Sequence, residues 1–222
     1  MNNIAEHIQK IKASLPANVT LVAVSKFHPA EALMEAYEAG QRIFGESRAQ
    51  ELVAKEKVLP KDIEWHFIGT LQTNKVKDIA PFIHTIHSID SLKLLQEVNK
   101  QAEKHGRIIR VLLEIHVAEE ETKHGLTPDE CRTLLDSDLS NLRHVQIGGL
   151  MGMATFTDDM ERVRSEFRRL SSLFHELKEH YFANQPEFKD LSMGMSHDYH
   201  IAIEEGSTMV RIGTDIFGER QY

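Results

Sequence analysis

Short apolar runs alternate with amphipathic stretches along almost the whole chain. Apolar residues recur at helical spacing from Ile4 to Leu15, which predicts an amphipathic helix that ends near Pro16. The eight runs that follow have the length and composition of strands, and they cover residues 21–26, 42–45, 64–69, 82–87, 108–117, 145–151, 190–193 and 209–213. Helical spacing returns between these runs, so strands and helices are predicted to alternate strictly.

Start and stop signals support the helices between the runs. Pro29 and Gly40 bracket one stretch, in the order that is typical of helix starts and ends. Ser47 followed by Gln50 resembles a capping box that opens the next helix. Further start signals are Asp90-Ser91 and Thr127-Pro128.

Strict alternation favours parallel strands that are joined by right-handed crossovers. Eight such units are the number that closes a (β/α)8 TIM-type barrel. An open, doubly wound sheet is the alternative, but no Gly-x-Gly-x-x-Gly follows the first run. No linker rich in proline, glycine or serine divides the chain. We therefore predict an α/β fold with a single domain over residues 1–222, a TIM-type barrel with an extra N-terminal helix.

Charge and composition exclude several classes of protein. The chain of 222 residues has 26 lysines and arginines against 34 aspartates and glutamates, which gives 26 − 34 = −8. A net acidic chain is a poor candidate for binding to nucleic acid or to an anionic membrane, since both need a basic footprint. The longest conspicuous uncharged stretch, residues 145–157, is shorter than the roughly 20 residues of a membrane span.

Cys131 is the only cysteine, so an intramolecular disulfide is excluded, and this favours a cytoplasmic location. It lies in a predicted helix, where a buried and unreactive thiol is the expected state. The first residues carry charges where a signal peptide needs its apolar stretch, so secretion is not expected.

Lys26 ends the first apolar run, and the carboxyl ends of the strands are where active sites gather in such barrels. If its side chain points into the barrel mouth, burial disfavours the charged form and lowers its pKa. A neutral amine attacks a carbonyl group and forms a Schiff base. The alternative is a lysine that extends to solvent at the end of a strand.

The ends of the last two runs carry residues that suit a phosphate group. Gly213 lets backbone amides approach an anion, and Thr214 adds a hydroxyl donor. Ser192 and Ser196 offer further hydroxyl groups. A tight turn at Thr214 and a helix cap at Ser196 are the structural alternatives. A strand-end lysine together with such a cradle is what a phosphorylated aldehyde requires.

Arg211 alternates with apolar neighbours, so its guanidinium is predicted to face the barrel interior. Guanidinium only donates hydrogen bonds and stays protonated. Beside a pyridine nitrogen it keeps that nitrogen unprotonated, which weakens the ring as an electron sink. A structural ion pair with Glu205 or Asp215 is the alternative.

No metal-ligand set is predicted. Among the 13 histidines, His84 and His87 are closely spaced, as are His197 and His200. Residues three apart on a strand face opposite sides, and the second pair lacks an obvious third ligand. These histidines are therefore expected to be core or solvated side chains.

Together these residues resemble the pyridoxal phosphate homeostasis protein family, which is related to the N-terminal barrel of alanine racemase. The resemblance spans nearly the whole chain, and the combination of motifs is highly specific. The motifs are Val24-Ser25-Lys26, Phe44-Gly45-Glu46-Ser47, Trp65-His66-Phe67-Ile68-Gly69, Leu71-Gln72-Thr73-Asn74-Lys75, Leu150-Met151, Leu191-Ser192-Met193-Gly194-Met195-Ser196, and Gly206-Ser207-Thr208-Met209-Val210-Arg211-Ile212-Gly213-Thr214.

The resemblance implies a barrel of fold type III that holds pyridoxal 5'-phosphate as a Schiff base on Lys26. It also implies phosphate contacts from Ser192, Gly213 and Thr214, with Arg211 near the ring nitrogen. Such proteins are implied to be cytoplasmic carriers or regulators in vitamin B6 and amino-acid homeostasis, without catalytic residues, whose recipients are pyridoxal-phosphate-dependent apo-enzymes. Ser47 stands where the family usually has asparagine, so it keeps a capping hydroxyl and lacks the amide.

Two enzymes are the alternatives. A small amino-acid racemase needs an acid/base group on each face of the cofactor. In the alanine racemase relatives the second group, a tyrosine, comes from a C-terminal β domain. This chain ends at Tyr222, soon after the last run, so no such domain is expected and a carrier is the preferred hypothesis. An aldolase-type barrel, in which Lys26 bonds a sugar phosphate directly, is the third hypothesis. A monomer is expected because nothing marks an obvious interface.

Overall fold

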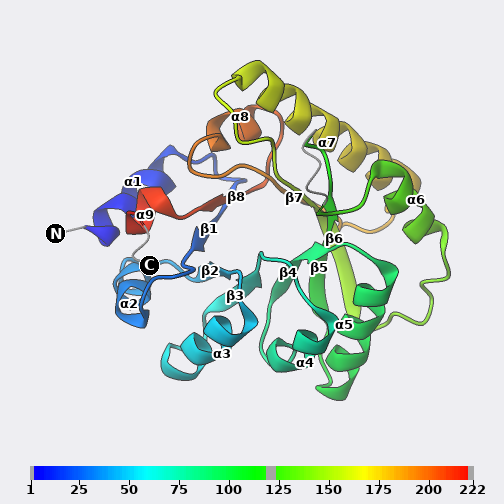
Figure 1. The fold of residues 1–222 in the computed structure, drawn as a ribbon, viewed down its shortest axis with the longest axis horizontal. Coiled ribbons are helices and arrows are strands. Elements are labelled where there is room, and N and C mark those ends of the chain that lie inside the picture. The colour runs from blue at the N-terminus through cyan, green and yellow to red at the C-terminus, as the bar shows by residue number, and fades with distance from the viewer. Residues whose placement is uncertain (1–2, 119–123, 220–222) are drawn as a thin grey trace.

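The computed structural model describes residues 3–118 and 124–219, so Tyr222 lies outside the described residues. In this part of the chain, parallel strands close a barrel in sequential order from β1 to β8, and β1 pairs with β8. The helices surround the strands (Figure 1). The predicted (β/α)8 barrel is confirmed.

The eight strands of the described residues lie where the apolar runs predict them, with small shifts at their ends. They are β1 (Thr20–Val24), β2 (Ile43–Glu46), β3 (Glu64–Phe67), β4 (Thr85–Ile89), β5 (Ile109–Ile115), β6 (Val145–Gly152), β7 (Asp190–Ser192) and β8 (Met209–Ile212). The largest shift is at β4, which was expected to begin at Phe82. The backbone amides of Phe82 and Ile83 both donate to the carbonyl of Ile79, so these residues close the preceding helix and the strand begins later.

The helices fill the stretches between the strands. They are α1 (Ile4–Ser14), α2 (Ala30–Glu38), α3 (Ala49–Val58), α4 (Val76–Ile79) after a 3-10 turn η1 (Thr73–Lys75), α5 (Leu92–Lys104), α6 (Pro128–Asp136), α7 (Met160–His180), α8 (Tyr199–Glu204) and α9 (Thr214–Phe217). Two of the predicted start signals are confirmed: the Ser91 hydroxyl caps α5, and Thr127 with Glu130 forms a capping box on α6.

The capping box predicted for Ser47 and Gln50 is wrong. α3 begins at Ala49, with Arg48 as a cap residue that makes no side-chain cap hydrogen bond. The backbone of Ser47 packs instead against Gly69, where an added Cβ atom would collide with the Ser47 carbonyl oxygen. The close approach of these two loops, rather than a helix cap, fixes this turn.

The N-terminal helix completes the ring of helices. α1 lies beside α9, the last described helix (Figure 1). Ile4, Ile8 and Ile11 form its buried stripe, as the helical spacing predicts. A ring nitrogen of His7 lies 3.1 Å from the carbonyl oxygen of Ile216. The extra helix therefore covers the place where the last strand returns to the first.

The interior of the barrel contains several buried polar side chains. Several hydrogen bonds join strands that are not neighbours, so their side chains point into the barrel. They are His87 to Ser192 at 3.0 Å, Arg211 to the carbonyl of Gly152 at 3.1 Å, and Arg110 to Asp190 at 2.7 Å. Because side chains alternate along a strand, the residues between them face the helices and form the apolar layer outside the strands.

α7 spans 21 residues, which is the length of a membrane span, but charged residues occur throughout it. Its buried side chains, which include Phe167 and Leu170, form a stripe that packs on the barrel. No helix in the described ranges is both long and apolar enough to cross a membrane.

Cys131 on α6 is fully buried, as predicted. Burial raises the pKa of its thiol to about 12. Since the thiolate is the reactive form, only roughly one thiol in ten thousand is ionised at about pH 8. We expect native protein to leave Ellman's reagent unreacted over minutes and to react stoichiometrically once urea unfolds it. Rapid labelling of the native protein would contradict a buried thiol.

Candidate functional site

A cavity of about 330 Å³ opens at the carboxyl ends of the strands. Four of the five predicted site residues line it: Lys26, Arg211, Gly213 and Thr214. The other lining residues come from the end of β1 and from the segments after β1, β3, β6, β7 and β8, and they are Val24, His28, Ile68, Met153, Phe156, Met195, Ser196, His197 and Gly218. Segments far apart in sequence meet here because parallel strands bring their carboxyl ends to one face.

Lys26 lies in the turn directly after β1 and is partly buried. Phe27, the next residue, has a φ of +67°, and it is the only non-glycine residue with a positive φ in the described ranges. A left-handed backbone at an aromatic residue costs free energy and persists only where neighbouring contacts hold it. The turn that presents Lys26 is therefore imposed by its surroundings.

A buried charged cluster supplies those contacts. The backbone amide of Phe27 donates to the Glu51 carboxylate at 2.7 Å, and the Ser25 hydroxyl donates to Glu46 at 2.6 Å. The ammonium of Lys55 joins these groups, since it donates to the Ser25 carbonyl at 2.8 Å and to both carboxylates at 2.7 Å. Both neighbours of Lys26 in the chain are thus held by one network, which we call the Lys55 cluster.

We expect Lys55→Met to lower the free energy of unfolding by about 2 kcal/mol and to weaken ligand binding at Lys26 several-fold. Burial already raises the pKa of Glu46, so without Lys55 this carboxyl takes up a proton rather than staying charged and unpaired. When the pKa of a carboxyl group is higher in the folded protein than in the unfolded chain, the group stabilises the fold at pH values below its pKa in the unfolded chain. This stabilisation is lost as the pH rises through its pKa in the folded protein. The variant should therefore lose more stability at pH 8 than at pH 5.

Urea unfolding of both proteins at the two pH values measures this effect. Lys57→Met is the matched control, because Lys57 is an exposed lysine on the same helix. Equal losses in the two variants, or a Lys55→Met penalty that does not change with pH, would contradict the cluster's role.

Arg211 lies at the floor of the cavity and is 4% exposed. It donates to the carbonyl and hydroxyl oxygens of Ser192 at 2.9 and 2.7 Å, and to the carbonyl of Gly152. Burial lowers the pKa of this guanidinium to about 10, which still leaves it protonated at neutral pH. Glu205 pairs instead with Arg164 and Arg168, so it does not form the ion pair considered for Arg211.

Ser192 lies deeper than the sequence suggests. It is fully buried, it does not line the cavity, and its hydroxyl lies between Arg211 and His87. His87 in turn contacts His66, with Nε2 and Nδ1 2.8 Å apart. Burial lowers the pKa of both imidazoles, to about 3 for His66, so the pair is neutral. The predicted phosphate contact of Ser192 stays a prediction, and its hydrogen bonds favour the positioning of Arg211.

The loops after β7 and β8 form the other wall of the cavity. An added Cβ at Gly213 would come 3.0 Å from the Val24 carbonyl oxygen, so only glycine fits without displacement. Thr214 is exposed to the cavity and opens α9. Ser196 also lines the cavity, in the turn before α8. The cap of α8 is Asp198 and not Ser196, so the Ser196 hydroxyl is not used as the helix cap considered for it.

Met153 and Phe156 also line the cavity and have no role predicted from the sequence, while His197 was expected to be only a core or solvated side chain. Phe156 is 80% exposed, and its ring meets the His197 imidazole edge to face at 4.9 Å. Its position in a loop after β6 was the available signal, since an aromatic residue in a strand-end loop of a barrel is a candidate for ligand contact.

The lining fits a small phosphorylated aldehyde. One amine, from Lys26, and one buried cation, Arg211, share a cavity with hydroxyl groups and a glycine turn. Its volume lies at the lower end of the range of small-molecule sites.

Comparison with known proteins identifies a family. The alanine racemase N-terminal domain family matches residues 1–221. A pyridoxal phosphate homeostasis protein of Aquifex aeolicus is 42% identical over 100% of this chain and 97% of its own length. The solved structure of PipY from Synechococcus elongatus with pyridoxal phosphate bound has a TM-score of 0.87 at 38% identity, and covers 97% of this chain and 100% of its own. An alanine racemase of Clostridium difficile has the same fold, with a TM-score of 0.76 at 15% identity over 100% of this chain and 58% of its own.

Proposed function

The chain belongs to the pyridoxal phosphate homeostasis proteins, within the alanine racemase N-terminal domain family, and from this premise we propose that it binds pyridoxal 5'-phosphate as a carrier or regulator in vitamin B6 and amino-acid homeostasis. The observation that carries the proposal is that Lys26 and Arg211 line one cavity at the carboxyl ends of the strands. The relative with bound pyridoxal phosphate, PipY, supports it.

Lys26 is the proposed covalent attachment point. Its amine would hold the aldehyde carbon of the cofactor as a Schiff base, which forms with loss of one water and without oxidation or reduction. The Lys55 cluster holds both neighbours of this lysine, so the amine is presented by a fixed turn. Gly213 and Thr214 are the proposed phosphate contacts, because they face the cavity from the loop after β8.

Arg211 is the proposed partner of the ring nitrogen. Its hydrogen bonds in the described residues go to neutral oxygens of Ser192 and Gly152, so none of these hydrogen bonds is an ion pair. A group with a pKa of about 10 does not give a proton to a pyridine nitrogen at neutral pH. The ring would then stay a weak electron sink, which limits carbanion chemistry on the cofactor.

A racemase is the competing function. Two-base racemisation needs a proton-transfer group on each side of the cofactor. Among the residues that the structure describes, the cavity lining includes Lys26, His28 and His197 as such groups, and no tyrosine. If the protein is a racemase, alanine should exchange its α-proton in heavy water at an enzyme-like rate; we expect no exchange above that of free pyridoxal phosphate.

We also propose that the protein acts in the cytoplasm as a monomer, with pyridoxal-phosphate-dependent apo-enzymes as recipients. The buried, unpaired Cys131 suits a reducing compartment. Light scattering during size-exclusion chromatography measures the oligomeric state. Transfer of the cofactor is tested by mixing the loaded protein with an apo-enzyme and measuring the activity that the apo-enzyme gains.

The direct test adds pyridoxal phosphate to the purified protein and then reduces it with borohydride. We expect a visible absorbance band, loss of that band on reduction, and one added pyridoxyl phosphate group on the tryptic peptide that contains Lys26. A protein that stays colourless, or a label on another lysine, would overturn the proposal.

A further inference from the structure

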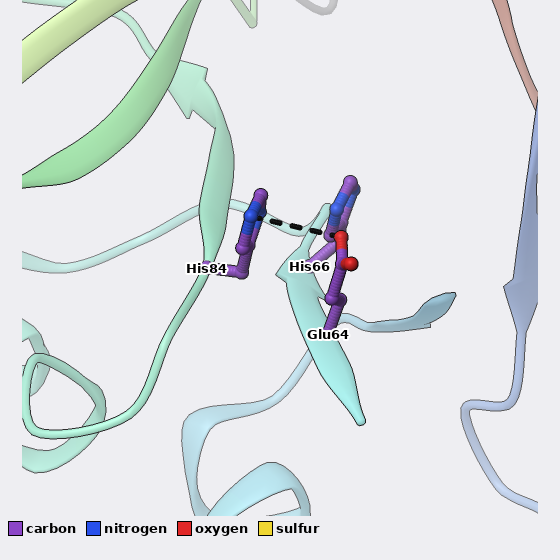
Figure 2. Close-up of side chains that lie close together, drawn as sticks. All are labelled: Glu64, His66 and His84. Atoms are coloured by element: carbon purple, nitrogen blue, oxygen red, sulfur yellow. Dashed lines mark ion pairs between the residues drawn. The ribbon is translucent and has the colours of Figure 1, made fainter. Parts of the chain in front are cut away.

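A second cluster of titratable side chains lies at the opposite mouth of the barrel from the cavity. Glu64 is the first residue of β3, His66 lies two residues further along that strand, and His84 directly precedes β4. One nitrogen from each imidazole and one carboxylate oxygen all lie within 4.8 Å of one another. Figure 2 shows the three side chains gathered between the two strands. We propose that this cluster binds a divalent transition-metal ion, with zinc as the reference ion.

Each of the two imidazoles already engages one ring nitrogen with another group of the protein. Histidines that bind a metal ion nearly always engage their second ring nitrogen with another group of the protein, which fixes the ring. In His84, Nδ1 lies 2.8 Å from the hydroxyl of Thr85, and in His66, Nδ1 lies 2.8 Å from Nε2 of His87. In both rings Nε2 is therefore the nitrogen that is left for a ligand.

His66 Nε2 gives independent support. The residue is 2% exposed, and Nε2 is a buried polar atom without a hydrogen-bond partner among the described residues. A buried nitrogen without a partner lowers stability, so such atoms are few in folded proteins. A metal ion bound to this nitrogen would satisfy it.

The distances and exposures allow the ligands to converge. Glu64 Oε2 and His84 Nε2 are 3.6 Å apart, close to the roughly 3.4 Å that separates two ligands in a tetrahedral zinc site. The rings of His66 and His84 lie parallel at 5.6 Å, so the His84 ring has to turn toward the ion. The side chains of His84 and Glu64 are 48% and 47% exposed, which permits that turn and gives the ion a path from solvent.

The surrounding charges tolerate a cation. Arg110 also lies at this end of the barrel, and its charge opposes a metal ion. Its Nε is 2.7 Å from Asp190, and its Nη1 is 3.6 Å from Glu187, so its charge is largely balanced. Glu64 brings a further negative charge to the ion itself. Two nitrogens and one carboxylate suit zinc, cobalt or nickel better than magnesium or calcium, which prefer oxygen ligands.

A metal at this position would also act on the other end of the barrel. If Nε2 of His66 binds the ion, Nδ1 of the neutral ring carries the hydrogen and donates to His87 Nε2. His87 then donates from Nδ1 to the Ser192 hydroxyl, which already accepts from Arg211. The ion would thereby fix which group donates and which accepts in the hydrogen bonds from His66 to His87 and from His87 to Ser192, beneath the floor of the cavity.

Zinc titration of the metal-free protein, followed by calorimetry, tests the proposal without pyridoxal phosphate. We expect one zinc ion per chain in the wild-type protein. His84→Ala and Glu64→Gln should each weaken binding at least on the order of 10- to 100-fold, since even the outer partners of metal ligands contribute that much. His105→Ala, at an exposed histidine after α5, is the matched control and should bind zinc as the wild type does.

Nitrogen-resolved NMR of the histidine rings provides the second measurement. We expect added zinc to shift Nε2 of His66 and His84 and to leave His66 protonated on Nδ1. Shifts confined to other histidines would overturn the proposal. So would zinc affinity that is equal in the wild type and in the His84→Ala and Glu64→Gln variants. Neither measurement depends on cofactor binding, so failure here is distinct from failure of the proposed function.

Discussion

Replacing Lys26 by alanine is expected to abolish the borohydride-stable adduct and to weaken pyridoxal phosphate binding on the order of 100-fold or more, because only the phosphate and ring contacts remain. The lysine lies in a turn at the cavity, and the Lys55 cluster holds both of its neighbours in the chain without it. The fold should therefore be retained, with a free energy of unfolding within about 0.5 kcal/mol of the wild type.

Absorbance titration with pyridoxal phosphate, with and without borohydride, measures the loss. Lys100→Ala is the matched control, because the Lys100 side chain is 63% exposed on α5, away from the cavity lining. A Lys26→Ala protein that still forms the absorbance band and the reduced adduct would assign the attachment to another amine.

Arg211→Met is expected to lower the free energy of unfolding by about 3–5 kcal/mol, the cost of removing one partner from a buried charged network. The variant leaves the Ser192 hydroxyl and the Gly152 carbonyl without this donor. It also removes the cation that faces two buried acids, Glu114 and Asp198. Binding of pyridoxal phosphate should weaken at the same time, because the proposed partner of the ring nitrogen is lost.

Arg211→Lys tests whether the positive charge at this position is sufficient without the planar guanidinium. It keeps a cation and loses the planar fork, so we expect a smaller loss of stability than in Arg211→Met. Urea unfolding with and without the cofactor measures both effects. A change below about 1 kcal/mol in Arg211→Met would show that the interior network does not depend on this residue.

Ser192→Ala decides between two roles of the serine. If the hydroxyl acts by positioning Arg211, stability should fall by about 1 kcal/mol and cofactor affinity should fall only a few-fold. A loss of affinity as large as that of a phosphate-contact variant, Thr214→Ala, would favour the direct phosphate contact that the family resemblance implies.

Much of the fold follows from local patterns. The spacing of apolar residues predicted the strands, and eight alternating strand–helix units are the number that closes a barrel. The predicted start of β4 was wrong because backbone hydrogen bonds to Ile79 extend the preceding helix. The capping box at Ser47 failed because a close approach to Gly69 decides that turn. Such an approach between two loops leaves no mark in either segment alone.

The sequence by itself determined the barrel and the placement of Lys26, Arg211, Gly213 and Thr214 around one cavity. Residues that end parallel strands meet at one face, whatever the register between the strands. Only the tertiary structure decided that Ser192 lies beneath the cavity, that the Lys55 cluster holds the Lys26 turn, and that His66 and His84 converge with Glu64. These contacts depend on strand register and on which side chains point inward, and a shift of one residue reverses both.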